Sequence, residues 1–235
     1  MIRKKQRHYV EKTGLIIGVS FLLLFPLYRK MEIYLAKKTY YNRPYWQNEC
    51  DDFAQEIPRD SLIVFFGNSI TKGFDLHTFH NDRMLNFGIV GDFTQGVLRR
   101  VPLVTRLKPQ KVFLKIGIND IIAQVPLAEM EANYLAIIAA LRQGAPQTEI
   151  YIQSILPVVD RNSMLTSSDQ NNSRVMAFNL FLQHYCATAH LTFINLFPYF
   201  ADQHNQLKKT YTYDGIHLTN EGYAVWKTQL IPYLK

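Results

Sequence analysis

The chain lacks the residues and motifs that would place it in several common protein classes. It has two cysteines among 235 residues, too few for the disulfide framework of a small secreted domain. It contains no Gly-x-Ser-x-Gly elbow, no glycine-rich dinucleotide fingerprint and no phosphate-cradling Gly-Lys-Ser/Thr loop. These absences argue against a lipase-type elbow, a dinucleotide site and a P-loop.

The two cysteines, Cys50 and Cys186, leave two interpretations open. They could pair in an oxidising compartment. Cys186 also lies inside an apolar helical pattern over residues 181–189, which is typical of a buried free thiol, and this second interpretation is favoured.

The body of the chain also lacks the surplus of basic charge that nucleic-acid binding requires. The formal net charge is +7, from 26 Lys and Arg against 19 Asp and Glu. Residues 1–43 contain ten basic and two acidic residues, which leaves residues 44–235 with 16 basic and 17 acidic residues. Because contacts to a phosphate backbone need basic residues gathered on a folded surface, we expect no nucleic-acid partner.

One uncharged apolar run lies near the N-terminus. Residues 13–28 (TGLIIGVSFLLLFPLY) form 16 uncharged residues between two basic segments. At ~1.5 Å per helical residue the run spans about 24 Å, slightly less than a ~30 Å hydrocarbon core. The flanking Lys and Arg side chains can reach the interface and close that gap.

Three interpretations of this run remain open: an uncleaved signal anchor, a cleaved signal peptide, and a core or surface helix. The anchor is favoured because no small-x-small cleavage site follows and basic flanks do not suit a core helix. We therefore expect a basic segment and transmembrane anchor over residues 1–28, a stalk over residues 29–60, and a body outside the cytoplasm. Cleavage would instead give a secreted protein, and basic residues on both sides weaken the orientation signal.

From residue 61 onward the chain alternates between short apolar runs and segments with helical spacing. The unbroken runs suit strands buried on both faces of a parallel sheet. They cover residues 62–66, 85–89, 112–116, 150–155 and 191–196. The helical segments cover residues 94–107, 127–143, 172–189 and 220–234. This alternation predicts one three-layer α/β/α domain over residues 61–235, with a five-stranded parallel sheet of flavodoxin-like type.

In an open parallel sheet, functional residues gather in the loops at the carboxyl ends of the strands. Four segments carry polar residues at such positions: 66–71 (FGNSIT), 86–92 (NFGIVGD), 115–120 (KIGIND) and 214–223 (DGIHLTNEGY). Taken singly, each has an ordinary explanation as a helix cap, a tight turn or a surface residue.

Taken together, the four segments hold the parts that ester hydrolysis needs. That reaction requires a hydroxyl nucleophile, a base, a carboxylate that orients the base, and donors for the developing oxyanion. Ser69, His217 and Asp214 supply the first three parts, and Gly91 with Asn119 supplies donors.

The same segments resemble the blocks of the SGNH (GDSL-like) hydrolase superfamily in order and general spacing. Residues 66–69 resemble its nucleophile block, residues 117–120 its Gly-x-Asn-Asp block, and residues 214–217 its Asp-x-x-His block. Residues 85–94 are similar to the branch that contains the α-type platelet-activating-factor acetylhydrolase subunits. One departure is Asn68, which stands where the family usually has Asp; this substitution removes a charge and keeps hydrogen-bonding capacity.

The resemblance implies a role for each matching residue. Ser69 attacks the ester carbonyl, His217 transfers the proton and Asp214 orients the imidazole. The backbone N–H groups of Ser69 and Gly91 and the side-chain amide of Asn119 then form the oxyanion hole. The remaining residues of these blocks are expected to brace the site rather than react: Asn68, Asp92 and Asp120. No metal or cofactor is required.

Two further groups of residues are candidates of lower weight. His77 and His80 have a spacing that some metal sites use, but they lack cysteine or glutamate partners, and a solvated loop is favoured. Aromatic residues precede the last block and could line a substrate cleft or simply pack: Tyr199, Phe200, Tyr211 and Tyr213.

The sequence supports a serine ester hydrolase and leaves its substrate open. We expect a small acyl group, such as acetyl, on a carbohydrate or cell-envelope carrier. The alternatives are a lysophospholipase or thioesterase, and a non-catalytic relative that binds glycan or serves as an anchored structural protein. The sequence does not indicate an oligomeric state.

Overall fold

The computed structural model describes residues 31, 35, 40–160 and 168–234. The chain divides into two compact units, Met1–Gln47 and Asn48–Lys235, and the second unit holds the sheet. The anchor helix expected over residues 13–28 lies outside the described residues. Within the part of the chain that the structure describes, no helix has both the length and the hydropathy needed to cross a membrane.

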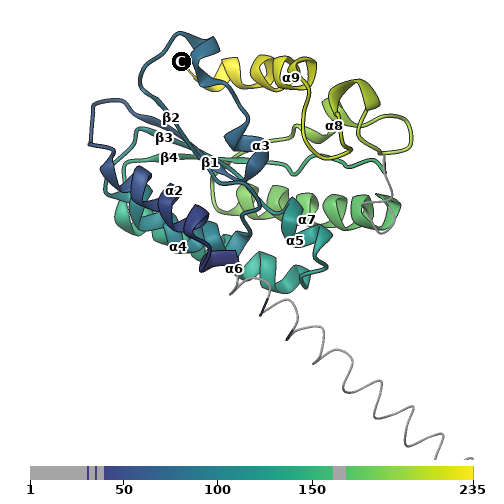
Figure 1. Ribbon diagram of the computed structural model, residues 1–235, viewed down its shortest axis with the longest axis horizontal. Helices are drawn as coiled ribbons and strands as arrows, with labels where there is room; N and C mark the ends of the chain where they lie inside the picture. The colour runs from purple at the N-terminus through teal and green to yellow at the C-terminus, as the bar shows by residue number, and fades with distance from the viewer. Residues whose placement is uncertain (1–30, 32–34, 36–39, 161–167, 235) are drawn as a thin grey trace, which may run out of the picture. The chain divides into compact units, whose positions relative to one another are not determined.

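The second unit is built on a five-stranded, fully parallel sheet with the strand order β2-β1-β3-β4-β5 (Figure 1). Its strands are β1 (Ile63–Gly67), β2 (Met84–Gly88), β3 (Lys111–Lys115), β4 (Glu149–Gln153) and β5 (Thr192–Ile194). Each overlaps an apolar run of the sequence, which confirms the predicted number, order along the chain and direction of the strands. The edge strand β5 is shorter than its apolar run because only three of its residues pair with β4.

Helices cover both faces of the sheet (Figure 1). The main ones are α2 (Pro44–Gln55), α4 (Thr94–Thr105), α6 (Leu127–Gly144), α7 (Ser168–Thr188) and α9 (Asn220–Leu230). The shorter ones are α3 (Ser69–Lys72), α5 (Ile118–Ile122), α8 (Phe197–Phe200) and the 3-10 turns η1 (Leu76–Phe79), η2 (Lys209–Tyr211) and η3 (Ile231–Tyr233).

The strand order determines which helices share a face. The connections from β2 to β3, β3 to β4 and β4 to β5 all run in one direction across the sheet, so right-handed crossovers place α4, α6 and α7 on the same face. The connection from β1 to β2 runs the other way, and α3 with η1 therefore lies on the opposite face. Figure 1 shows α9 on that opposite face too, which completes the three-layer α/β/α arrangement.

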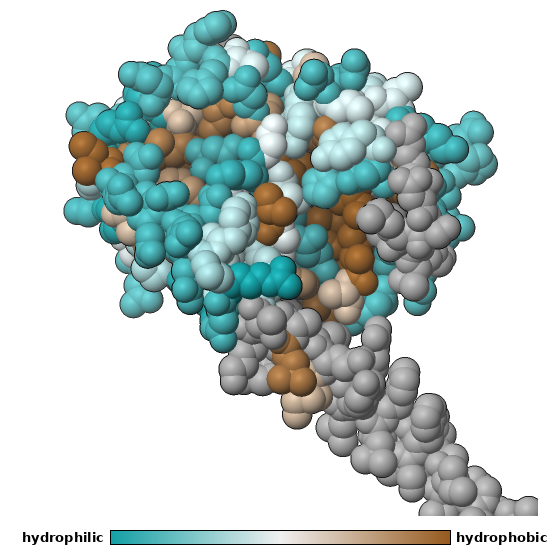
Figure 2. Space-filling view, in the orientation of Figure 1, coloured by the Kyte–Doolittle hydropathy of each residue, from teal (hydrophilic) through white to brown (hydrophobic). Residues whose placement is uncertain are grey.

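A row of aromatic side chains forms the core beneath α9. Phe65 of β1 stacks on Phe113 of β3, with ring centroids 5.0 Å apart, and Phe113 stacks on Tyr151 of β4 at 4.7 Å. Trp226 of α9 also belongs to this core. Its ring is fully buried, and its Nε1 donates to Gln153 Oε1 of β4 at 2.7 Å. On the face that Figure 2 draws, the surface is mostly hydrophilic with separate apolar patches, as expected when large apolar side chains fill the core.

The segment expected to be a stalk, residues 29–60, contains helix α2, and the second compact unit already begins at Asn48. Phe53 is the buried residue of α2, and its ring stacks on that of Phe87 in β2 with centroids 4.3 Å apart. Arg106 donates to the carbonyl of Phe53 as well. The sequence did not reveal this helix because a single buried side chain gives no apolar periodicity.

Both cysteines are free thiols. Cys186 is buried within α7, where burial raises the pKa of its thiol to about 11. This thiol therefore has the environment of a packing residue rather than of a nucleophile.

Candidate active site

The nucleophile candidate stands where β1 turns into α3. Ser69 is the first residue of α3, and Asn68 caps this helix, because its Oδ1 accepts a hydrogen bond from the backbone N–H of Ile70 at 3.1 Å. Gly67 has no room for a side chain: a Cβ there would lie 2.2 Å from the carbonyl oxygen of Lys115. The close approach of β1 and β3 therefore requires glycine directly before the capping residue Asn68.

The structure brings the serine, the histidine and the aspartate of the predicted site into one hydrogen-bonded chain. Ser69 Oγ lies 2.9 Å from His217 Nε2, although the two residues are 148 positions apart in the sequence. His217 Nδ1 lies 2.6 Å from Asp214 Oδ2. A proton on Nδ1 directed at the carboxylate leaves Nε2 as the acceptor for the serine hydroxyl, which is the arrangement that a general base needs.

The backbone of the 214–217 turn holds the aspartate in place. Asp214 Oδ1 accepts from the N–H groups of Ile216 and His217 at 2.9 and 2.8 Å, and Gly215 permits the turn with a φ of 99°. Partial burial acts to raise the pKa of Asp214, but the hydrogen bonds from His217 and Ile216 outweigh it and hold this pKa below its ordinary value. The carboxylate is therefore ionised at neutral pH.

The oxyanion-hole candidates lie on loops that follow the carboxyl ends of neighbouring strands. Gly67 pairs in register with both Gly88 and Lys115, so the loops after β1, β2 and β3 leave the sheet side by side. Gly91 takes a φ of 77° in the loop after β2. Asn119, at the start of α5, donates from Nδ2 to the carbonyl of Asp92 at 2.8 Å, which ties the β3 loop to the β2 loop.

Of the two bracing aspartates, Asp120 fixes the start of α4. It is fully buried and accepts from both the backbone N–H and the hydroxyl of Thr94, at 2.9 and 2.8 Å. Asp92 is also fully buried, and its Oδ2 forms an ion pair with Arg100 at 2.6 Å. Arg100 was not among the predicted site residues; the signal for it in the sequence is a charged residue on the apolar face of the predicted helix, eight positions after Asp92.

Two exposed side chains directly precede candidate site residues in the sequence: Tyr213 before Asp214 and Val90 before Gly91. Tyr213 is 61% exposed, and its ring stacks on the imidazole of His217 with centroids 5.9 Å apart. Val90, next to Gly91, is 49% exposed. Of the aromatic residues suggested as cleft lining, the structure places Tyr213 against the imidazole, whereas Phe200 is buried and packs on Tyr211.

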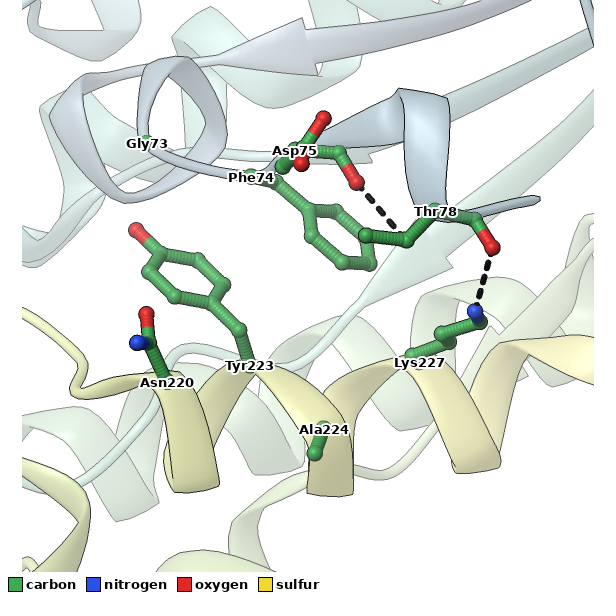
Figure 3. A pocket seen from close by; sticks show the side chains of 8 residues that line it. All are labelled: Gly73, Phe74, Asp75, Thr78, Asn220, Tyr223, Ala224 and Lys227. Atoms are coloured by element: carbon green, nitrogen blue, oxygen red, sulfur yellow. Dashed lines mark hydrogen bonds between the residues drawn. The ribbon is translucent and has the colours of Figure 1, made fainter. Parts of the chain in front are cut away.

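A separate hollow of about 440 Å³ lies between α9 and the segment that joins α3 to η1 (Figure 3). Tyr223 and Lys227 project into it from α9, opposite Phe74, Asp75 and Thr78. Ser69 and His217 do not line this hollow.

The described residues contain no group of three or more His, Cys, Asp or Glu side chains that could hold a metal ion. His77 lies in the exposed turn η1, and His80 ends that turn in the left-handed conformation.

The fold and the hydrogen-bonded chain of Ser69, His217 and Asp214 define the class of protein: an ester-bond hydrolase built on the SGNH-type α/β/α fold. The chain belongs to the GDSL-like Lipase/Acylhydrolase family, whose model matches residues 65–225. The predicted family resemblance is therefore confirmed.

Among curated proteins, the chain is 21% identical to the human platelet-activating factor acetylhydrolase IB subunit alpha2 over 187 residues, which cover 76% of this chain and 79% of that protein. It is 25% identical over 193 residues to an N-acylneuraminate cytidylyltransferase of Escherichia coli, covering 80% of this chain. The match spans less than half of that relative, 44% of its length.

Solved structures with the same fold include a candidate platelet activating factor from Streptococcus pneumoniae. It is 29% identical, with a TM-score of 0.73, and the match covers 88% of this chain and 99% of that one. A GDSL-like lipase from Bacteroides thetaiotaomicron is 21% identical, with a TM-score of 0.71 and coverage of 81% and 97%. The second likeness shows the fold alone.

Replacing Asp214 by asparagine tests the electrostatics of the site. Because the folded-state pKa lies below the ordinary value, the ionised carboxylate stabilises the fold above that ordinary value, and this contribution is lost as the pH falls through the lower, folded pKa. We expect Asp214→Asn to lower the free energy of unfolding at about pH 6, and the difference from the wild type to narrow toward about pH 3. Urea unfolding followed by tryptophan fluorescence measures both values, and a difference that stays constant over this range would contradict the assignment.

Proposed function

We propose that the protein is an acylesterase that removes small acyl groups, such as acetyl, from a carbohydrate or cell-envelope ester through an acyl-enzyme on Ser69. The observation that carries this proposal is the unbroken hydrogen-bonded chain from the Ser69 hydroxyl through His217 to Asp214. The proposed nucleophile, base and orienting carboxylate lie within hydrogen-bonding distance of one another.

The geometry supports a two-step reaction. Ser69 Oγ attacks the ester carbonyl carbon while its proton passes to His217 Nε2, and His217 then gives this proton to the departing alcohol oxygen. A water molecule, deprotonated by the same nitrogen, attacks the acyl-enzyme, and the acid leaves as the serine recovers its proton. Asp214 stays ionised throughout and stabilises the imidazolium.

The developing oxyanion needs donors that are fixed in advance. We assign this role to the backbone N–H groups of Ser69 and Gly91 and to the side-chain amide of Asn119. An amide nitrogen carries two hydrogens, and Asn119 directs one of them to the carbonyl of Asp92, which orients the other. Losing one such donor typically costs about 10²–10³ in rate.

Two observations favour a small acyl group on a sugar. One relative is an acetylhydrolase subunit, and another is an N-acylneuraminate cytidylyltransferase, an enzyme named for an acylated sugar. The exposed ring of Tyr213 lies beside the base and offers a flat surface on which the C–H face of a sugar can pack. Lysophospholipid or thioester hydrolysis is the second candidate, since the matched family includes lipases.

A fluorophosphonate probe, which reacts with activated serines, tests whether the protein is catalytic. We expect the wild type to become labelled and Ser69→Ala to remain unlabelled, because the substitution removes the hydroxyl that lies within hydrogen-bonding distance of His217 Nε2. Ser154→Ala, which removes a buried serine that binds Leu196 and Phe197, is the matched control and should be labelled like the wild type once folded. A wild type that resists the probe would favour the non-catalytic alternative, and labelling of Ser69→Ala would refute the assigned nucleophile.

A series of p-nitrophenyl esters separates the two classes of substrate. We expect kcat/KM to be highest for acetate and to fall with each longer chain, roughly tenfold or more by octanoate, because the proposed substrate carries a small acyl group. A kcat/KM that rises steeply with chain length would overturn the acetylesterase proposal in favour of a lipolytic enzyme, while leaving the role of Ser69 intact.

We also propose that residues 13–28 attach the protein to a membrane, with the hydrolase domain outside the cytoplasm. The support is the sequence itself: an uncharged run of 16 residues between two basic segments. The described structure does not include this run.

Membrane fractionation of the full-length chain tests this attachment. We expect the wild type to sediment with membranes and resist alkaline extraction, and Leu23→Asp to lose this association, since a carboxylate at the centre of a span costs about 2.5–3.5 kcal/mol. Leu22→Val is the matched control and should sediment like the wild type. A shortened N-terminus in the mature protein would show that the segment is a cleaved signal peptide instead.

A further inference from the structure

A buried arginine of α4 has no part in the acyl transfer described above, yet it bonds to the segments that carry the site. Arg100 is 1% exposed. Its Nε and Nη2 donate to Asp92 Oδ2 at 3.0 and 2.6 Å. Its Nη1 donates to the carbonyl of Phe87 at 3.0 Å, and its Nη2 also donates to the carbonyl of Gly67 at 3.1 Å.

Burying Arg100 and Asp92 in the interior has a large desolvation cost. Removing two charges from water costs several kcal/mol per ion, and apolar residues of similar volume often serve stability as well or better. Here the guanidinium lies over the ring of Phe66, 4.8 Å from its centroid, and Asp92 is fully buried. An apolar side chain could not donate hydrogen bonds to three separate acceptors, and the rigid guanidinium fork of Arg100 does so.

The three acceptors of Arg100 lie within four residues of the proposed oxyanion donors along the chain. Gly67 is two residues before Ser69 at the end of β1, and Phe87 is four residues before Gly91 at the end of β2. Asp92 follows Gly91, and its backbone carbonyl accepts the hydrogen bond that orients Asn119.

We propose that Arg100 is the positioning residue of the oxyanion hole: one guanidinium holds the ends of β1 and β2 and the side chain of Asp92, and thereby sets the relative positions of the N–H groups of Ser69 and Gly91 and of the amide of Asn119. Arg100 acts through these groups and does not touch the substrate. This inference rests on the proposed function of Ser69.

The proposal determines which kinetic constant should change. Oxyanion donors must lie about 2.7–3.1 Å from an oxygen that carries its charge only in the transition state. A loosened hole therefore lowers kcat and leaves KM nearly unchanged, whereas general damage to the substrate site changes both constants.

Arg100→Lys tests this expectation in the full-length enzyme, with a p-nitrophenyl ester as substrate. Lysine keeps the charge beside Asp92 but cannot reach all three acceptors, so we expect kcat to fall about 10–100-fold with KM within about twofold of the wild type. A trifluoromethyl ketone, which forms an oxyanion on the serine, should lose affinity by the same factor as kcat. Arg99→Lys, on the exposed neighbouring residue of the same helix, is the matched control and should keep wild-type kinetics.

The outcomes are distinguishable. If folded Arg100→Lys is less stable but keeps the wild-type kcat and ketone affinity, Arg100 is merely structural and the proposal is wrong. If Arg100→Lys does not fold, Asp92→Asn serves as the second variant: it weakens the pair and keeps an acceptor oxygen, and it should lower kcat about tenfold at constant KM. An unchanged kcat in folded Asp92→Asn would again refute the proposal. A wild type without esterase activity would instead refute the proposed function itself.

Discussion

The contact between Ser69 and His217 is the interaction on which the site depends, because it joins the start of the domain to its C-terminal segment. Two further hydrogen bonds support this arrangement: the first joins the two ends, and the second ties the 214–217 turn to the loop after β4. The hydroxyl of Tyr223 in α9 donates to the carbonyl of Ile70 in α3 at 2.9 Å, and the N–H of Val159 donates to the carbonyl of Gly215 at 3.0 Å. The packing of α9 against the sheet and the α3 turn thus places the imidazole, and a local change in either region would move the base relative to the nucleophile.

The carboxylates near the site differ in function because their surroundings differ. Asp214 is partly exposed, accepts three hydrogen bonds from the 214–217 turn and faces the imidazole, which suits a group that must stabilise a transient cation. Asp92 and Asp120 are fully buried and satisfied by Arg100 and Thr94, so they fix backbone rather than exchange protons. Asn68 is also buried and uses one oxygen to cap α3. The charge lost relative to the usual Asp is therefore not needed for the cap, and its absence avoids another buried charge.

The sequence was sufficient to predict the sheet and to select the residues Ser69, His217 and Asp214 that the structure brings together, for physical reasons that do not extend to every element. Strands buried on both faces leave unbroken apolar runs, and the four polar segments follow from the rule that parallel strands expose their carboxyl ends at one edge. Arg100 was not predicted because arginine in a helix is normally solvated, and the fold is needed to show its three acceptors. Helix α2 was not predicted because Phe53 is its one buried residue, and one buried residue gives no apolar periodicity. The register that sets Gly67 level with Gly88 and Lys115 is a property of pairing between distant segments, which local pattern does not encode.

The structure separates the residues proposed to perform acyl transfer from residues that could select a substrate. The proposed donors, nucleophile and base lie on segments that are held by hydrogen bonds at the end of β1, between the loops after β2 and β3, and within the tight 214–217 turn. The exposed residues beside them, Val90 and Tyr213, lie in loops, and their side chains can change without disturbing those bonds. It follows that differences in substrate among proteins with this fold should reside in such flanking positions. Because the proposed reacting residues belong to this frame and the flanking residues do not, a likeness of the site says more about the reaction than about the substrate.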